Sequence, residues 1–118
     1  MSLEIGFQQE ALALNFLESK GLTLIEKNFR SRMGEIDLIM RDPLYQGRPY
    51  LVFIEVRYRS NPYYGSGLES IHAGKIKKLR RTAEWYLQKK KWTDKVFCRF
   101  DVISLSNSTD IQWIRSAF

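Results

Sequence analysis

The sequence predicts an α/β fold in which a mixed central sheet is flanked by helices, and three observations lead to this prediction. Apolar residues recur at steps of three and four over residues 2–20 and again over about 68–90, as in amphipathic helices. Segments rich in β-branched and aromatic residues lie between and after these helices. The resulting order, αβββαβ with a further edge strand, and the length of 118 residues indicate one domain over residues 1–118.

The first helix is expected over residues 2–20, and Gly21 stands where a left-handed residue often ends a helix. The segment LTLIEKNF at 22–29 is β-prone and follows directly. The apolar side of the helix is expected to consist of Leu3, Phe7, Ala11, Leu14 and Leu17.

Two strong strands come next and are expected to pair as an antiparallel hairpin. GEIDLIM at 34–40 alternates in polarity, which places Ile36, Leu38 and Met40 on one face of the strand. YLVFIEVRY at 50–58 forms the second strand. Two prolines and a glycine predict that residues 41–49 between them form a loop.

A second loop is expected over 59–67, and a long helix over about 68–90. The start of this helix is ambiguous, because Ser66 with Glu69 forms a capping box whereas Ser70 is an alternative cap. VFCRFDVISL at 96–105 is a third clear strand, and IQWIR at 111–115 is expected at the sheet edge. The apolar residues of the second helix are Ile76, Leu79, Ala83, Tyr86 and Leu87.

The composition favours a globular cytoplasmic protein. The sequence is 44% hydrophobic, yet it has no run of about 18 apolar residues that would cross a membrane. The first ten residues carry acids and glutamines rather than the basic and apolar pattern of a secretory signal. The single cysteine, Cys98, has no partner for an internal disulfide, and with His72 it supplies too few ligands for zinc.

The net charge of +6 comes from one part of the sequence. Residues 72–99 contain ten lysines or arginines against two acids, whereas residues 1–71 and 100–118 each carry a net charge of −1. Concentrated positive charge attracts polyanions, above all nucleic-acid phosphates. A solvated helix face kept soluble by lysines is the alternative explanation.

Two of the predicted strands carry charged residues where a core normally has aliphatic ones. Residues two apart in a strand share a face, so Glu55, Arg57 and Arg59 point to one side of 50–58. In the expected hairpin, Asp37 and Glu55 converge, and two close carboxylates repel unless a cation or a proton lies between them. A buried ion pair with Arg57 is the structural alternative. Glu35 has a structural explanation beside Arg30 and Arg32.

An acid, a strand, and then an acid-x-base sequence is the arrangement of metal-dependent phosphodiester hydrolysis. Carboxylates hold Mg²⁺ or Mn²⁺, and a bound water attacks the polarised phosphate. The cationic side chain two residues after the second acid orients that water or stabilises the developing negative charge. Glu10 points from the first helix toward its apolar stripe and fits the same pattern, although an ordinary solvated acid is the simpler explanation for it alone.

The segments GFQQEALALNFLESKG, NFRSRMGEIDLIM, LVFIEVRYR and RFDVISL resemble the YraN-like family of uncharacterised bacterial proteins that are predicted to be endonuclease-like. That family is similar to the restriction-endonuclease-like, PD-(D/E)xK superfamily, and within it to archaeal Holliday junction resolvases. The resemblance implies a restriction-endonuclease-like αβββαβ core. It also implies metal-ligand roles for Asp37, Glu55 and the backbone carbonyl of Val56, and the first-helix acid role for Glu10.

The sequence departs from the superfamily at Arg57, where a lysine is usual. Arginine stays protonated at neutral pH, so it cannot accept a proton, although it can hold a phosphate. Lys75, at the edge of the apolar face of the second helix, is the nearest candidate to supply the missing ammonium, and similar family members have a lysine there. The proposed catalytic residues are therefore Asp37, Glu55, Arg57, Glu10 and Lys75.

The expected partner is nucleic acid, in the first place DNA, branched or damaged forms included, with Lys77, Lys78, Arg81 and Arg59 as contacts to phosphates. Tyr63 and Tyr64 would stack on unpaired bases or pack in their own loop. An enzyme of this kind that cuts two strands would form a homodimer. A non-catalytic nucleic-acid-binding module and an interaction protein with an acidic partner or membrane surface remain as alternatives.

Overall fold

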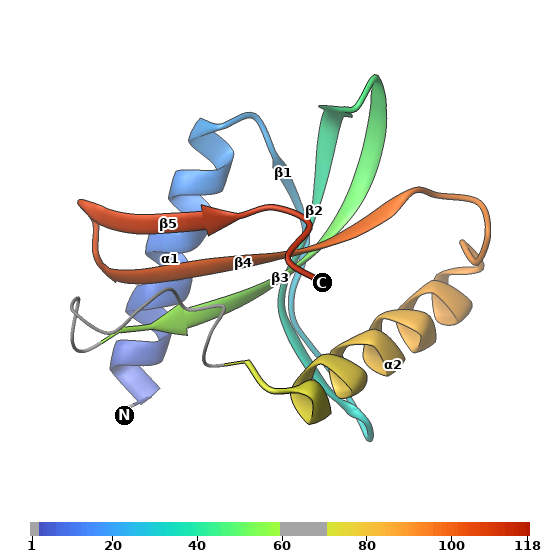
Figure 1. The fold of residues 1–118 in the computed structure, drawn as a ribbon, viewed down its shortest axis with the longest axis horizontal. Helices are drawn as coiled ribbons and strands as arrows, with labels where there is room; N and C mark the ends of the chain where they lie inside the picture. Colours follow the sequence, from blue (N-terminus) through green and yellow to red (C-terminus); the bar gives the residue numbers. More distant parts are fainter. Residues whose placement is uncertain (1–2, 60–70) are drawn as a thin grey trace.

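The computed structural model describes residues 3–59 and 71–118, and the side chains from residue 6 onward. A five-stranded sheet forms the centre of the molecule, with two helices beside it (Figure 1). The elements in chain order are α1 (Leu3–Ser19), β1 (Thr23–Ser31), β2 (Gly34–Tyr45), β3 (Arg48–Tyr58), α2 (Ala73–Lys90), β4 (Cys98–Asn107) and β5 (Asp110–Ile114).

The strands lie in the sheet in their order along the chain, from β1 to β5. The pairs β1–β2, β2–β3 and β4–β5 are antiparallel, whereas β3 and β4 are parallel and are connected through α2. A parallel pair needs such a crossover because a tight turn cannot connect two strands that run in the same direction. The predicted mixed sheet, the β2–β3 hairpin and the edge strand at the C-terminal end are thereby confirmed.

Each face of the sheet has its own apolar core. Leu38, Met40, Val52 and Ile54 pack with Ala13 and Leu17 of α1. On the other face, a second cluster joins the sheet to α2 and is made of Phe29, Ile36, Ile39, Leu51, Phe53, Leu79, Ala83 and Tyr86. Alternating strand residues therefore separate into two layers, as the period of a strand requires.

The predicted loop over 41–49 is wrong, because most of it is strand. β2 continues to Tyr45 and β3 begins at Arg48, so the connection is the two-residue turn of Gln46 and Gly47. Both turn residues have positive φ, 50° and 84°, which suits the tight turns that match the twist of a hairpin. Pro43 is accommodated where the register of β2 against β3 shifts between Asp42 and Tyr45.

The second helix begins later than predicted. It starts at Ala73, and His72 caps it by accepting a hydrogen bond from the backbone N–H of Lys75. The expected caps, Ser66 with Glu69 or Ser70, lie outside the described residues.

Two predicted apolar faces differ from the observed ones. Ile36 packs in the α2-side cluster while Leu38 packs in the α1-side cluster, so the alternation of the strand breaks at Asp37 between them. In α1, Phe7 and Ala11 are exposed, and the helix instead buries Gln9, Ala13 and Leu17. Within residues 3–59 and 71–118, neither helix is long and apolar enough to cross a membrane.

Candidate functional site

The carboxylate of Asp37 lies where the β2–β3 hairpin stops pairing through its backbone. The last backbone pair at this end is Leu38 opposite Ile54, so Asp37 and Glu55 each lie one residue beyond it. Asp37 Oδ2 instead accepts a hydrogen bond of 2.8 Å from the backbone N–H of Val56. This bond holds the Asp37 side chain against the part of β3 that carries Glu55.

Burial and neighbouring acids make the Asp37 carboxyl group hard to ionise. Removal from water raises its pKa to about 7, and the negative charge of Glu55 contributes in the same direction. The Val56 N–H lowers the pKa, because it favours the charged form, while Glu10 and Glu35 raise it further. The negative charges of Asp37 and Glu55 therefore repel each other, as expected for two carboxylates that approach one another.

Glu55 is buried, with 7% of its side chain exposed, and receives cations from two elements. Lys75 Nζ, in the first turn of α2, lies 3.3 Å from Glu55 Oε1. Arg57 Nη1, two residues further along β3, lies 3.7 Å from the same oxygen. The structure therefore places Lys75 beside the second acid, where its sequence position had suggested that an ammonium group would be found.

Close packing of α2 against the start of β2 fixes the position of Lys75 relative to Asp37. Gly34 begins β2 with φ of 147°, a conformation that glycine adopts readily. A Cβ atom at Gly34 would lie 3.3 Å from Thr82 Oγ1 in α2, a tight contact that would require the Thr82 side chain to shift by a few tenths of an ångström. Gly34 thus allows β2, which carries Asp37, to pack closely against α2, which carries Lys75.

Glu10 lies on α1, on the other side of the same strands. Burial raises the pKa of its carboxyl group, and a side-chain hydrogen bond with Asn28 opposes this effect. Asn28 has a φ of 56° within β1, where a short polar side chain tolerates the left-handed conformation. Glu10 and Asn28 line a cavity of about 310 Å³ together with Lys27 and Leu38. Glu10 thus faces a cavity, and its charge reaches Asp37.

Three predicted phosphate contacts lie on the outer surface of α2. Lys77, Lys78 and Arg81 are exposed, while Leu79 and Ala83 of the same helix are buried in the core. The apolar side of α2 is therefore occupied by its own sheet and is not available for docking to an external surface. The helix presents its positive charge outward, beginning one turn from Lys75.

Arg59 lies apart from that surface. Its guanidinium is only 10% exposed and forms an ion pair of 2.9 Å with Asp110, at the start of β5. It also donates to the backbone carbonyls of Ser104 and Asp110. The structure accounts for Arg59 as a connection between β3 and the β4–β5 edge. Tyr63 and Tyr64 lie outside the described residues.

The oxygen atoms at this site are those that a hard divalent cation prefers. Asp37, Glu55 and the backbone carbonyl of Val56 offer carboxylate and carbonyl oxygens, which suit Mg²⁺ or Mn²⁺ when water completes the coordination. In the described part of the chain, no three His, Cys, Asp or Glu side chains gather closely enough to form a complete protein metal site. A cation here would therefore keep water ligands.

Glu35 forms an exposed ion pair with Arg30, its partner across β1 and β2, at 3.3 Å. Its position agrees with the structural explanation given from the sequence. Because both side chains are more than half exposed, this pair adds little to stability.

Sequence reasoning missed a buried charge network between β2 and β4. Arg99 donates to both carboxylate oxygens of Asp101 at 3.0 and 3.1 Å and to Asp42 at 2.8 Å. Asp101 also accepts from Trp113 Nε1 at 2.9 Å and from the backbone of Ser116 at 3.1 Å. Arg99 and Asp101 in RFDVISL are a base and an acid two residues apart in an apolar strand, as are Glu55 and Arg57. This pattern could have identified the buried network.

This network also corrects the estimate of surface charge. Arg99 was counted among the ten basic residues of 72–99, but it is buried and paired with two acids. Of the nine others, Lys75 is half-buried beside Glu55 and eight are exposed. The basic character of α2 and the segment after it therefore remains.

Comparison with known proteins places this chain among relatives that match it over nearly their whole length. It is 46% identical to a UPF0102 protein of Alkalilimnicola ehrlichii, over 98% of this chain and 87% of that protein. It is 43% identical to a UPF0102 protein of Shewanella sediminis, over 100% and 94%, and 46% identical to one of Legionella pneumophila strain Corby, over 100% and 97%.

A family model adds an independent match, since it covers residues 9–105 and with them Glu10, Asp37, Glu55 and Lys75. The relatives and this model agree on the same assignment. The chain belongs to the uncharacterised protein family UPF0102.

Proposed function

We propose that this protein is a Mg²⁺- or Mn²⁺-dependent nuclease that hydrolyses phosphodiester bonds of DNA, branched or damaged DNA included. The observation that carries the proposal is the pair of acids at the end of the β2–β3 pairing, half-buried Asp37 and buried Glu55, with Lys75 at 3.3 Å from Glu55. The element order α1-β1-β2-β3-α2-β4 is consistent with the restriction-endonuclease-like core that the sequence resembles.

The residues present fit a divalent cation. A carboxyl group whose pKa is raised to about 7 by burial and by a second acid gains from a cation that neutralises both. Asp37, Glu55 and the Val56 carbonyl would hold it, and water would fill its other positions. When bound, such an ion polarises the phosphate and lowers the pKa of a coordinated water.

In the reaction, a water molecule loses a proton to solvent as its oxygen forms a bond to phosphorus, the ester P–O bond breaks, and the departing oxygen takes up a proton from solvent. Arg57 lies beside Glu55, and we assign to its guanidinium the stabilisation of negative charge on the phosphoryl oxygens. Lys75 places its ammonium 3.3 Å from Glu55, and we assign to it the orientation of the attacking water. Glu10 takes the first-helix acid position through its charge interaction with Asp37.

The exposed lysines and arginine of α2 would position the DNA. Lys77, Lys78 and Arg81 lie on the same helix as Lys75, so contacts to phosphates there would place the backbone beside the acids. Such contacts carry no sequence information. We therefore expect binding that depends on salt and is largely indifferent to sequence. Arg59 is not included, because Asp110 already pairs with it.

A second candidate is a nucleic-acid-binding module that has retained the fold without catalysis. The observation that favours it is the arginine at position 57, together with the two cations already paired with Glu55. In that case Glu55 serves to form ion pairs with Lys75 and Arg57 rather than to bind a metal ion.

Incubation with supercoiled plasmid, single-stranded DNA and a four-way junction, with Mg²⁺, Mn²⁺ or EDTA, tests the proposal. We expect metal-dependent cleavage by the wild type, loss of cleavage in Asp37→Ala and Glu55→Ala, and retained DNA binding in both. If Arg57→Lys cleaves and the wild type does not, the binding module is correct. If neither cleaves any DNA or an RNA control, the nuclease proposal fails.

We further propose a two-fold homodimer for cleavage of two strands, since a symmetric pair would present two sites. Sedimentation equilibrium with a junction should then give twice the monomer mass of 14.0 kDa for the protein component. A single protomer on each junction would contradict this.

A further inference from the structure

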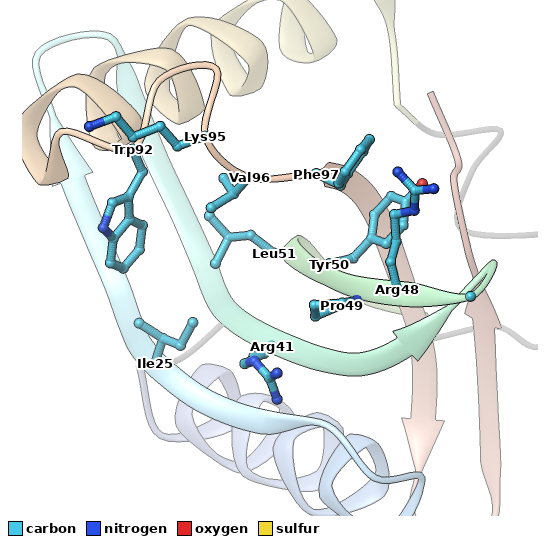
Figure 2. A pocket seen from close by; sticks show the side chains of 11 residues that line it. Ile25, Arg41, Arg48, Pro49, Tyr50, Leu51, Trp92, Lys95, Val96 and Phe97 are labelled. Atoms are coloured by element: carbon cyan, nitrogen blue, oxygen red, sulfur yellow. The ribbon is translucent and has the colours of Figure 1, made fainter.

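A second cavity lies at the opposite end of the β2–β3 hairpin from the acids. Its volume is about 480 Å³, within the range of about 300–1,000 Å³ that is usual for small-molecule sites. β1, β2, β3 and the segment after α2 contribute to its lining (Figure 2). Leu51 in this lining precedes Glu55 by four residues, which is about 13 Å along a strand. The cavity is therefore separate from the candidate metal site.

The charged residues of this cavity are all basic. Arg41, Arg48 and Lys95 line it, and no acid does. None of these three forms an ion pair with a carboxylate among the residues that the structure describes. All three are exposed, so their charge is available to a ligand. An anionic group would be attracted to this cavity.

Aromatic side chains provide the remaining recognition surface. The Arg48 guanidinium stacks over the Phe97 ring at 4.3 Å, and the Tyr50 and Phe97 ring centroids are 5.7 Å apart. Phe97 is 51% exposed, so part of its ring is open to a ligand. Figure 2 shows Trp92 on the other side of the cavity, with Leu51 and Val96 between it and Phe97. The lining of the cavity thus combines aromatic and aliphatic side chains.

We propose that this cavity binds a nucleotide unit, with its base against the aromatic side chains and its phosphate on Arg48, while Arg41 and Lys95 add positive charge around it. Base recognition commonly combines stacking on aromatic rings or arginine planes with a positively charged groove. An alkyl-chain anion such as a fatty acid would use the charge but not the flat aromatic surfaces. The unit is either a free mononucleotide or one nucleotide of a single strand, and the inference does not depend on nuclease activity.

Isothermal titration with AMP and with ribose 5-phosphate tests the role of the base, because the second ligand has the same phosphate and no base. We expect AMP to bind with a Kd below about 1 mM and ribose 5-phosphate to bind at least about tenfold more weakly. Amide NMR shifts should map AMP to residues 47–51 and 92–97. A short oligothymidylate is titrated in parallel, and its tighter binding than TMP would identify a strand as the source.

Two variants and a control decide whether this cavity is responsible. Arg48→Glu and Phe97→Ala should each weaken AMP binding about tenfold or more, and both residues are exposed enough for the fold to tolerate the change. Lys20→Glu, with the same change of charge as Arg48→Glu at the end of α1, should leave it unchanged. Equal effects of Arg48→Glu and Lys20→Glu would overturn the proposal.

Three other results would also overturn it. These are equal affinity for AMP and ribose 5-phosphate, absence of saturable binding by AMP, TMP and the oligonucleotide, and binding of laurate at the same residues without any nucleotide binding. Plasmid cleavage by Arg48→Glu separates this proposal from the nuclease proposal. Cleavage by this variant should persist while its AMP binding is weakened. Absence of cleavage in the wild type would contradict only the nuclease proposal, and absence of AMP binding would contradict only the cavity proposal.

Discussion

Asp37 carries a carboxyl group in a place that opposes its ionisation. Burial and the charge of Glu55 raise its pKa to about 7, well above the value near 3.8 of an exposed aspartate. Such a group binds a proton more tightly in the folded protein than in the unfolded chain. Its contribution therefore makes the protein less stable as pH rises from about 4 to about 7. A bound cation would offset this loss of stability, because its positive charge favours the ionised form of Asp37.

Asp37→Asn should accordingly stabilise the protein above neutral pH. Asparagine has nearly the same shape, and its carbonyl oxygen can still accept the Val56 N–H. We expect the free energy of unfolding to increase by about 2 kcal/mol at pH 8, and the difference from wild type to disappear near pH 4. Urea unfolding of both proteins at several pH values measures it. A difference that is independent of pH would show that Asp37 is ionised normally.

Arg57 and Lys75 should contribute differently to catalysis. Arg57→Ala should lower kcat by about two to three orders of magnitude, as for the loss of one charge donor, whereas Arg57→Lys should keep or raise it. Lys75→Ala should lower kcat by about 10²-fold or more, and Lys75→Arg should restore little of it, because a planar guanidinium does not replace a compact ammonium beside the water. Lys90→Ala, exposed at the end of α2, serves as the control for loss of one lysine. Full activity in Lys75→Ala would remove Lys75 from the site.

At this scale, the sequence identified the two acids but not their detailed contacts. Asp37 and Glu55 were recognisable because charge is rare in apolar strands, and Lys75 because of its place beside an apolar helix face. The hydrogen bond from Val56 to Asp37 was not predictable, since it depends on a break in alternation after Ile36. The pairing of Arg59 with Asp110 connects residues 51 positions apart, and no local pattern reveals it.

Among the elements, α2 combines a buried apolar side with an exposed basic one. Replacing Lys77, Lys78 and Arg81 together by alanine should weaken DNA binding and reduce the slope of log K against log salt by about 2–3 units. Fluorescence anisotropy at several salt concentrations measures the slope. The double variant Lys20→Ala with Arg115→Ala, at exposed positions outside α2, should change it little. An unchanged slope in the triple variant would mean that this surface is only solvated.

The ends of β2 and β4 are joined by the buried Arg99 network. Asp101→Ala should lower the free energy of unfolding by about 3–5 kcal/mol, because it leaves Arg99 buried with part of its pairing removed. Glu35→Ala removes an exposed pair instead and should cost at most about 1 kcal/mol. Thermal unfolding of the two variants compares them. Equal losses would contradict the network's importance.

The kinds and order of the elements were predictable, but several boundaries were not. Periodicity found both helices and all five strands, since each has enough residues for its pattern to show. Pro43, Gly47 and Pro49 predict a loop over residues 41–49. In the hairpin, Pro43 lies at a register shift and Pro49 at the start of β3, where a missing N–H is tolerated. Such tolerance depends on the neighbouring strand.

In the whole molecule, the two proposed sites lie toward opposite ends of the β2–β3 hairpin. The acids lie where β2 and β3 cease to pair, and the basic aromatic cavity lies beyond their turn, next to the segment that follows α2. α2, about 27 Å long at 1.5 Å per residue, extends from Lys75 toward that segment with its basic side outward.

The most direct test of the central claim is a crystal structure of the protein with Mn²⁺ at pH 8, where Asp37 is largely ionised. Anomalous scattering from manganese locates the ion without reference to activity. We predict one peak about 2.0–2.6 Å from carboxylate oxygens of both Asp37 and Glu55, and no peak there in Asp37→Asn crystals. Saturating Mn²⁺ with no peak at these two carboxylates in the wild type would contradict a metal-dependent site.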